Sequence, residues 1–275
     1  MHTLREIQLF ELKMLKDLAR ICEDNDIRYY LSSGTLLGAV RHGGFIPWDD
    51  DVDIYMPLPD YKKFLKIGQK LLDKAYGNAY FVQNYRTDKN YNEMWTQIRA
   101  NNTTSMPICC KKFDIHFGMC LDIFPIVGCS SDPKKQERQK KALRINKSLL
   151  ADKYMIAVGE HMNWKQKMIY EIPRCFRRLI CRLNESNLML DLNKNDCATI
   201  VWYKIPAIYP KEVFSETVKI RFEDADFFTF KEYKQYLTIL YGDYMQLPDE
   251  KDRGGHELTL GKIIIDLNND YTTYK

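Results

Sequence analysis

Apolar residues recur at helical spacing over the first twenty or so positions of the chain. The stripe is formed by Leu4, Ile7, Leu12, Leu15, Leu18 and Ile21. Because successive members lie three to five residues apart, they fall on one side of a helix. The pattern therefore predicts an amphipathic helix that buries one face.

Short extended segments and helices alternate over the next hundred residues. The patterns predict strands at 27–31, 52–56, 80–84, 94–100 and 119–127. Helices are expected at 36–41 and 61–72, with Ser32-Ser33-Gly34-Thr35 as a turn before the first of them. Alternating strands and helices of this kind predict an α/β core.

The pattern changes after residue 132. A long helical stretch is expected at 133–190 with a break at Pro173, followed by extended segments at 199–203 and 218–222 and a helix at 230–241. We therefore expect a core at 1–130, a helical insertion at 131–195, and a C-terminal part at 196–275 that returns to the core.

Acidic residues are concentrated at the start of one predicted strand. Asp49, Asp51 and Asp53 would share one face of that strand, and Asp50 would point away. Like charges this close raise one another's pKa unless a cation neutralises them. Mg²⁺ and Mn²⁺ prefer such hard oxygen ligands. An acidic surface turn is the alternative, because an acid-x-acid pair alone is not specific, and the spacing does not suit an EF-hand calcium loop.

Residues suited to phosphate binding precede the acids. Gly34 lets a backbone approach a phosphate closely, and Thr35 supplies a hydroxyl. The helix that follows would place free N–H groups nearby, and Arg41 offers a forked donor. The segment therefore predicts an anion site beside a metal site.

At this point the sequence resembles a known family. The 26-residue stretch LSSGTLLGAVRHGGFIPWDDDVDIYM is similar to the signature of the LicD family, the phosphorylcholine transferases related to fukutin. The likeness extends to the opening helix, to LDIFP (121–125) and to LYGDYMQLP (240–248), but not to the middle of the chain. It implies an α+β fold, with a nucleotidyltransferase-like mixed β-sheet, flanking helices and a helical insertion.

The resemblance also implies roles for individual residues. The family's small-residue element would be Ser33-Gly34-Thr35, although Thr35 stands where Gly or Ser is usual, and the gap at 36–50 is longer than in simpler members of the fold. The acids that bind metal would be Asp51, Asp53 and Asp122.

The implied reaction transfers a phospho-alcohol, such as phosphorylcholine or ribitol phosphate, from a CDP-linked donor such as CDP-choline to a hydroxyl of a glycan or lipid-linked glycan. Mg²⁺ (or Mn²⁺) would bridge the diphosphate. Asp49 would orient the metal ligands or act as a base. The remaining candidates for substrate binding are Ser33, Gly34, Thr35, Arg41, His42, Trp48 and Arg99. We expect Trp48 to wedge its loop rather than to stack on the nucleobase.

Other functions share these acids. A nucleotidyltransferase that moves a nucleoside monophosphate would use the same three carboxylates and would release pyrophosphate instead of CMP. A glycosyltransferase with an acid-x-acid site would need a longer βαβ run before the acids. A catalytically inactive nucleotide-binding scaffold would not need all three.

Composition and charge narrow the partners. The chain is 45% hydrophobic, which argues against disorder. Residues 133–183 hold fourteen Lys or Arg and four acids, so this segment has a net charge of +10. The whole chain has a net charge of +4, and the remaining residues therefore carry −6. This implies an anionic neighbour. No nucleic-acid motif appears, so we expect no nucleic acid. Eight cysteines without a secretory signal indicate reduced thiols and a cytoplasmic location, and no apolar run is long enough to span a membrane.

One basic segment also carries an apolar pattern. The apolar set is Trp164, Met168, Ile172, Phe176, Leu179, Ile180 and Leu183, with Lys and Arg between. It predicts either a helix that packs on the core with a solvated basic face or an interfacial helix at the inner face of a membrane. We favour the core-packing interpretation.

Overall fold

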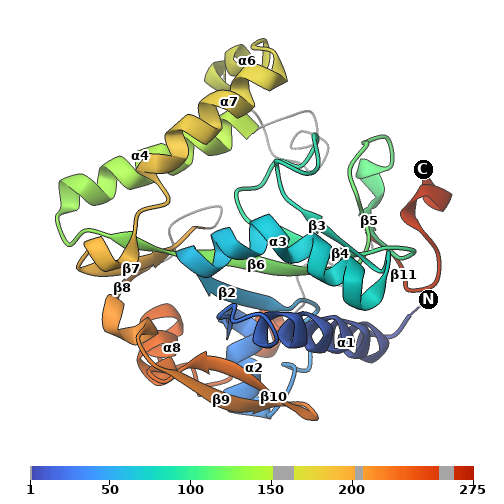
Figure 1. The fold of residues 1–275 in the computed structure, drawn as a ribbon. Helices are drawn as coiled ribbons and strands as arrows, with labels where there is room; N and C mark the ends of the chain where they lie inside the picture. The colour runs from blue at the N-terminus through green and yellow to red at the C-terminus, as the bar shows by residue number, and fades with distance from the viewer. Residues whose placement is uncertain (1, 151–163, 202–206, 254–262) are drawn as a thin grey trace.

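The computed structural model describes residues 2–150, 164–201, 207–253 and 263–275, and has an α+β architecture built on a mixed β-sheet (Figure 1). The strands of this sheet are β1 (Tyr30–Leu31), β2 (Asp53–Pro57), β3 (Tyr80–Gln83), β4 (Thr96–Ala100), β6 (Cys120–Cys129), β7 (Cys197–Ile200) and β8 (Ile208–Pro210). The order is β1-β2-β6-β4-β3, with β7 joined to the far half of β6 and β8 joined to β7. The expectation of an α+β fold with a mixed sheet is therefore confirmed.

Strand β6 lies at the centre of this sheet. Its first half pairs antiparallel with β4, its middle pairs parallel with β2, and its last residues pair antiparallel with β7. Seven of its ten residues are apolar, and most are buried because both faces of the strand are covered. The sheet therefore fixes the relative positions of residues that are far apart in the sequence.

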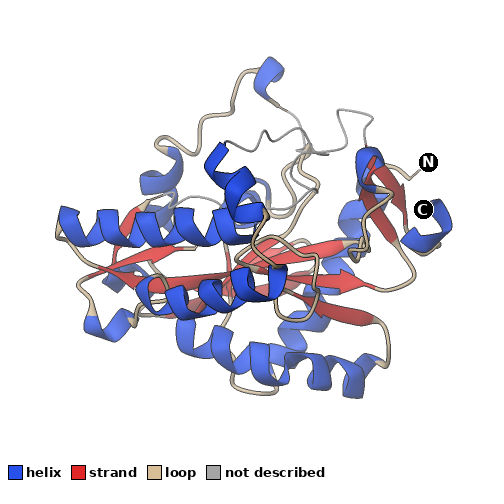
Figure 2. Cartoon of the chain, turned by 90° about the horizontal axis from the view of Figure 1, so that it is seen from above, coloured by secondary structure: helices blue, strands red, loops and turns tan. Residues whose placement is uncertain are grey.

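Helices cover the sheet and its edges (Figure 2). They are α1 (Leu4–Glu23), α2 (Ser33–His42), α3 (Leu58–Tyr76), α4 (Pro133–Leu150), α6 (Trp164–Tyr170), α7 (Arg174–Asn184) and α8 (Tyr233–Tyr241). Helix α3 packs on β2, β3 and β6, α1 packs on α3 and β6, and α2 packs on β2. Helices α4, α6 and α7 form a separate layer that touches the sheet through α4 (Figure 1). None of the helices that the structure describes is both long enough and apolar enough to cross a membrane.

Two further strand pairs bring the C-terminal residues back to the N-terminal half. The hairpin of β9 (Thr217–Phe222) and β10 (Ala225–Phe230) contacts α2 and β1. Strand β11 (Ile263–Asp266) pairs with β5 (Thr104–Pro107). Arg5 of α1 forms a two-pronged ion pair with Glu223 in the hairpin turn, which ties the first helix to this hairpin.

Most expected elements are present, with instructive differences. The first helix is confirmed, and it begins with a capping box in which Thr3 and Glu6 exchange hydrogen bonds. The predicted turn at Ser33-Gly34-Thr35 is wrong, because these residues form the first turn of α2. The expected strand at 52–56 begins only at Asp53, and the helix expected at 230–241 begins at Tyr233, because residue 230 ends β10. Part of the extended segment expected at 199–203 lies outside the described residues.

Candidate active site

Two carboxylates lie side by side on neighbouring strands. Asp53 is the first residue of β2 and is the direct partner of Asp122 in the parallel ladder with β6. Sixty-eight residues of sequence separate them, so only the sheet brings them together. The structure therefore places the distant acid beside the acid-x-acid segment, as the resemblance implied.

Asp49 and Asp51 also lie at the site, but the element that positions them is not the one that the sequence pattern predicted. Asp49 and Asp51 lie in the loop that precedes β2, so the expectation that they alternate on a strand is wrong. They nevertheless line the same cavity as Asp53. Close packing holds Asp49 there, because a Cβ built on Gly34 would lie 2.8 Å from Asp49 Oδ2. Gly34 therefore makes room for a carboxylate.

The acids lie between two cavities that meet at the same residues. A larger cavity of about 700 Å³ is lined by Asp49, Asp51, Asp53 and Asp122. A smaller cavity of about 270 Å³ is lined by Asp50, Asp51 and Asp122. Asp51 and Asp122 are the two aspartates that line both cavities.

Burial and mutual repulsion raise the pKa of these carboxyl groups. Burial is the main cause for Asp53, whose pKa is well above its ordinary value, and the charges of Asp51, Asp122 and Asp49 add to it. Burial and then the charge of Asp50 raise the pKa of Asp49 to about 6. Burial also raises the pKa of Asp122. A cluster of this kind attracts cations or protons.

The wall of the larger cavity combines α2, the loop before β2 and the segment after α8. Arg41 donates from Nη1 to the carbonyl oxygens of Tyr244 and Gln246, while its buried Nε has no hydrogen-bond partner. The ring of Trp48 lines the cavity and lies 5.2 Å from the guanidinium carbon of Arg253. Arg41 thus ties α2 to the segment after α8, which forms part of the cavity wall.

The remaining candidates near α2 serve the scaffold. Thr35 Oγ1 accepts the backbone N–H of Asp53 at 2.9 Å, so this hydroxyl fixes the start of β2. Ser33 lines the larger cavity, and its Oγ lies 3.1 Å from Tyr55 Oη. His42 is exposed, lines neither cavity, and contacts Trp48 edge to face. The structure therefore separates His42 from the acids.

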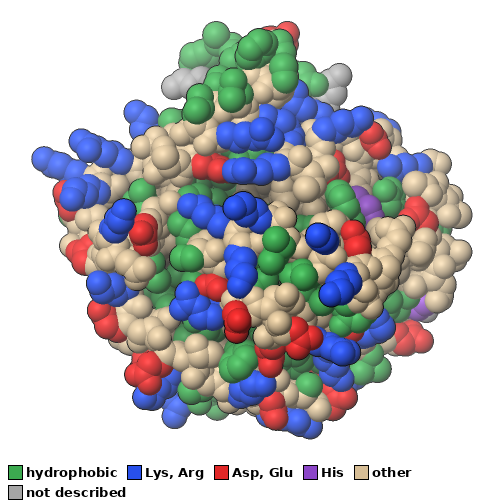
Figure 3. All heavy atoms as spheres, in the orientation of Figure 1, with side chains coloured by type: hydrophobic (Ala, Val, Ile, Leu, Met, Phe, Trp, Pro, Cys, Tyr) green, Lys and Arg blue, Asp and Glu red, His purple; other side chains and the backbone are tan. Residues whose placement is uncertain are grey.

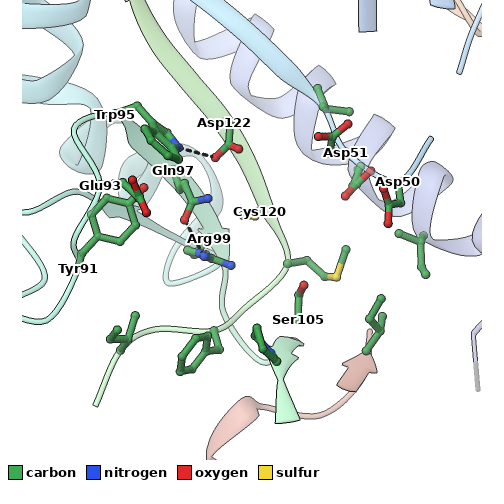
Figure 4. A pocket seen from close by; sticks show the side chains of 18 of the residues that line it. Asp50, Asp51, Tyr91, Glu93, Trp95, Gln97, Arg99, Ser105, Cys120 and Asp122 are labelled. Carbon is green, nitrogen blue, oxygen red and sulfur yellow. Dashed lines mark hydrogen bonds between the residues drawn. The ribbon is translucent and has the colours of Figure 1, made fainter. Parts of the chain in front are cut away.

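The smaller cavity has an aromatic and acidic wall (Figure 4). Trp95 Nε1 donates to Asp122 Oδ1 at 3.1 Å. Arg99 donates to Gln97 Oε1 at 2.6 Å, and also to Gln83 and to the carbonyl of Gly118. Arg99 therefore lines the smaller cavity beside Asp122, but it does not line the larger one.

Sequence analysis missed three residues of this wall. Tyr91 is buried and its hydroxyl has no hydrogen-bond partner, while Glu93 lies beside it (Figure 4). Glu11 on α1 also lines the cavity, and its buried Oε2 has no partner. Burial and the charges of four aspartates, with Asp51 first, raise the pKa of Glu11 well above its ordinary value. A signal for Glu11 was available, because it lies four residues from both Ile7 and Leu15 in the apolar stripe.

The donor set suits a hard divalent cation in its chemistry. Five aspartates and Glu11 offer carboxylate oxygens, and one of these oxygens is buried without a partner. As arranged here, however, no group of three His, Cys, Asp or Glu side chains in the described parts of the chain is positioned to hold one metal ion. The residues therefore fit a cation by charge and ligand type.

Comparison with known proteins finds a matching family model and several similar proteins. The family described as LicD/FKTN/FKRP, nucleotidyltransferase domain, matches residues 26–127. The lipopolysaccharide cholinephosphotransferase LicD of Haemophilus influenzae is 30% identical over 95% of this chain and 98% of its own length. The ribitol 5-phosphate transferase FKRP of Mus musculus is 47% identical over 18% of this chain and 11% of its own length. An uncharacterized protein of Rickettsia prowazekii, RP689, is 50% identical over 18% of each chain.

Proposed function

The chain belongs to the LicD family of transferases, and on this premise we propose that it moves phosphorylcholine from CDP-choline to a glycan hydroxyl with the help of Mg²⁺. One observation carries the proposal. Asp51 and Asp122 lie where two cavities meet, one large enough for a nucleotide and the other suited to a small head group. A CDP-linked donor bound across this junction has its diphosphate at the acids.

The larger cavity would take the cytidine nucleotide. Its volume of about 700 Å³ lies within the range of small-molecule sites. Trp48 offers an aromatic surface, the guanidinium group of Arg41 offers a positive charge, and the first turn of α2 at Ser33 and Gly34 lies in the wall. These groups suit a base and an anionic phosphate.

The smaller cavity would take the choline end of the donor. Its wall carries the rings of Tyr91, Trp95 and Phe117 together with the carboxylates of Glu11 and Glu93. Aromatic faces and acids bind quaternary ammonium groups, because the ring quadrupole and the negative charges both attract a cation that cannot donate hydrogen bonds.

The chain's own groups would position the reaction. Asp51, Asp53 and Asp122 would hold the metal ion, and the ion would supply charge neutralisation at the diphosphate. The acceptor oxygen forms a bond to the phosphorus that carries choline, the bond from that phosphorus to the CMP oxygen breaks, and the hydroxyl proton is released. Asp49, with its pKa of about 6, is suited to accept that proton near neutral pH.

The test is a product assay with CDP-choline, Mg²⁺ and lipopolysaccharide as acceptor. We expect CMP and a choline-labelled glycan in equal amounts, and loss of both in Asp51→Asn and Asp122→Asn. Release of pyrophosphate instead would support nucleotidyl transfer. Preference for CDP-ribitol over CDP-choline would contradict the assignment of the smaller cavity. Binding of CDP-choline without turnover under any condition would indicate a scaffold.

A further inference from the structure

Helix α7 is oriented opposite to the expectation from its sequence. Arg177 is buried and donates to the carbonyl oxygens of Ile172 and Leu149. On the opposite side, Phe176, Leu179 and Leu183 are exposed, with 69% of Leu183 accessible to solvent. The core-packing interpretation of this segment is therefore wrong, because the apolar face points away from the protein body.

The exposed apolar face continues onto α6, and we call the combined surface the apolar crest. Its members are Trp164, Met168, Ile172, Phe176, Leu179, Ile180 and Leu183. Figure 3 shows apolar side chains gathered at the top of the molecule, where α6 and α7 lie. Exposed aliphatic and aromatic side chains are normal when scattered singly, but a contiguous patch marks an interaction surface.

Basic side chains lie directly below the crest. Figure 3 shows a band of Lys and Arg side chains between the crest and the rest of this face. Lys167 and Arg182 are exposed on the crest helices themselves, and Lys141 and Arg144 are exposed on α4 alongside. This layering of an apolar tip over a basic band matches the hydrocarbon and anionic head-group layers of a membrane surface.

The crest is also rigidly tied to the protein. Arg178 donates from Nη2 to the carbonyl oxygens of Asp88 and Tyr91, and Arg174 donates to Asn90. These partners belong to the loop between β3 and β4, and Tyr91 of that loop lines the smaller cavity. The inward arginines thus fix the position of the crest relative to the acids.

From this arrangement we propose that the apolar crest docks on the surface of a membrane that contains anionic lipid. Leu179, Leu183 and Trp164 enter the boundary between head groups and acyl chains, and the basic band contacts the anionic head groups. The charge pattern favours this occupant over a second copy of the chain, because two copies facing each other through their crests would also bring their basic bands together. The proposal concerns location and does not depend on which group the enzyme transfers.

Co-sedimentation of the full chain with lipid vesicles tests the proposal. We expect binding to vesicles that contain phosphatidylglycerol at low salt, and weaker binding to pure phosphatidylcholine or at high salt. The double variant Leu179→Ser/Leu183→Ser should lose at least about tenfold in partitioning, because two apolar side chains no longer enter the lipid. A matched control, Leu9→Ser/Ile108→Ser, removes two equally exposed apolar residues elsewhere and should bind as the unmodified chain does.

Two further measurements separate the roles of charge and insertion. Lys167→Gln/Arg182→Gln should reduce binding to anionic vesicles about fivefold for each cation removed, and leave binding to neutral vesicles unchanged. Lipids with brominated acyl chains should quench part of the tryptophan fluorescence, and this quenching should be absent in Trp164→Phe. Thermal melting verifies that every variant is folded.

Three outcomes would overturn the proposal. The unmodified chain does not bind anionic vesicles at low salt, or it binds equally well after the leucine substitutions. Alternatively, analytical ultracentrifugation shows a dimer that Leu179→Ser/Leu183→Ser converts to a monomer, which would assign the crest to a second copy.

Discussion

The charge cluster predicts an unusual effect of Asp53→Asn on stability. Asp53 and Asp122 are direct partners on parallel strands, which lie about 4.8 Å apart. At an effective dielectric constant of about 20, two unit charges at that distance repel by about 3 kcal/mol. In the metal-free protein a proton can relieve part of this repulsion, so we expect the substitution to stabilise by about 1–2 kcal/mol near neutral pH. For a chain of this size, that raises the melting temperature by several degrees.

Magnesium should make the unmodified chain more stable than Asp53→Asn, which reverses the order of their melting temperatures. At a concentration one hundred times the dissociation constant, a ligand that binds only the folded state stabilises by about 2.7 kcal/mol. The unmodified chain would gain this increment, and Asp53→Asn would lose most of it along with its turnover. The assay is differential scanning fluorimetry of both proteins in EDTA and in a series of MgCl₂ concentrations.

A second buried aspartate provides the matched control. Asp60 accepts hydrogen bonds from the backbone N–H and the Nε of Arg28, so its charge is compensated. Asp60→Asn should therefore destabilise the protein by about 1–2 kcal/mol, with or without Mg²⁺. The reasoning is refuted if Asp53→Asn melts below the unmodified chain in EDTA. If the unmodified chain gains no stability from Mg²⁺, the metal assignment fails instead.

Three further predictions concern the same site. Gly34→Ala should reduce kcat about tenfold or more with little change in the melting temperature, because the new Cβ would displace the carboxylate of Asp49. Steady-state kinetics measures this effect, and an unchanged kcat would contradict the prediction. Trp95→Phe keeps an aromatic ring but removes the N–H that donates to Asp122. We expect a loss of about 1 kcal/mol in transition-state stabilisation, which is measured as a several-fold fall in kcat/KM. A fall in thermal stability alone would assign Trp95 a structural role only. The metal-free chain should lose stability as the pH rises from about 4 through about 6, because the pKa of Asp49 is raised in the folded state and its ionisation then disfavours folding. Chemical denaturation across this pH range measures the free energy of unfolding, and a rise in that free energy would contradict the argument.

The sequence predicted the parts of the site that depend on local order. The apolar stripe predicted α1, and the pattern at 52–56 predicted β2 to within one residue at each end. The acids at 49–53 were recognisable as a cluster because they are adjacent in the chain. The pairing of Asp53 with Asp122 followed only from a family resemblance, since a strand pattern does not specify its partner.

Other features had no local signal or a misleading one. Tyr91 and Glu93 lie in an irregular loop, and their place beside Asp122 depends on how β4 pairs with β6. In α7 the pattern was clear, but which face points inward was decided by carbonyl oxygens on other segments that accept from Arg177 and Arg178. Amphipathicity gives a helix two faces and does not say which one the protein covers.

The sequence by itself therefore determined the first helix, the approximate positions of several strands and helices in the first 130 residues, and the presence of a dense carboxylate group near a glycine. The tertiary structure decided which carboxylates meet, that two cavities share them, that Glu11 joins them, and that the crest remains outside. The physical reason is that periodicity and capping act between residues within one or two helical turns, whereas the site arises from sheet pairing and buried hydrogen bonds between distant segments.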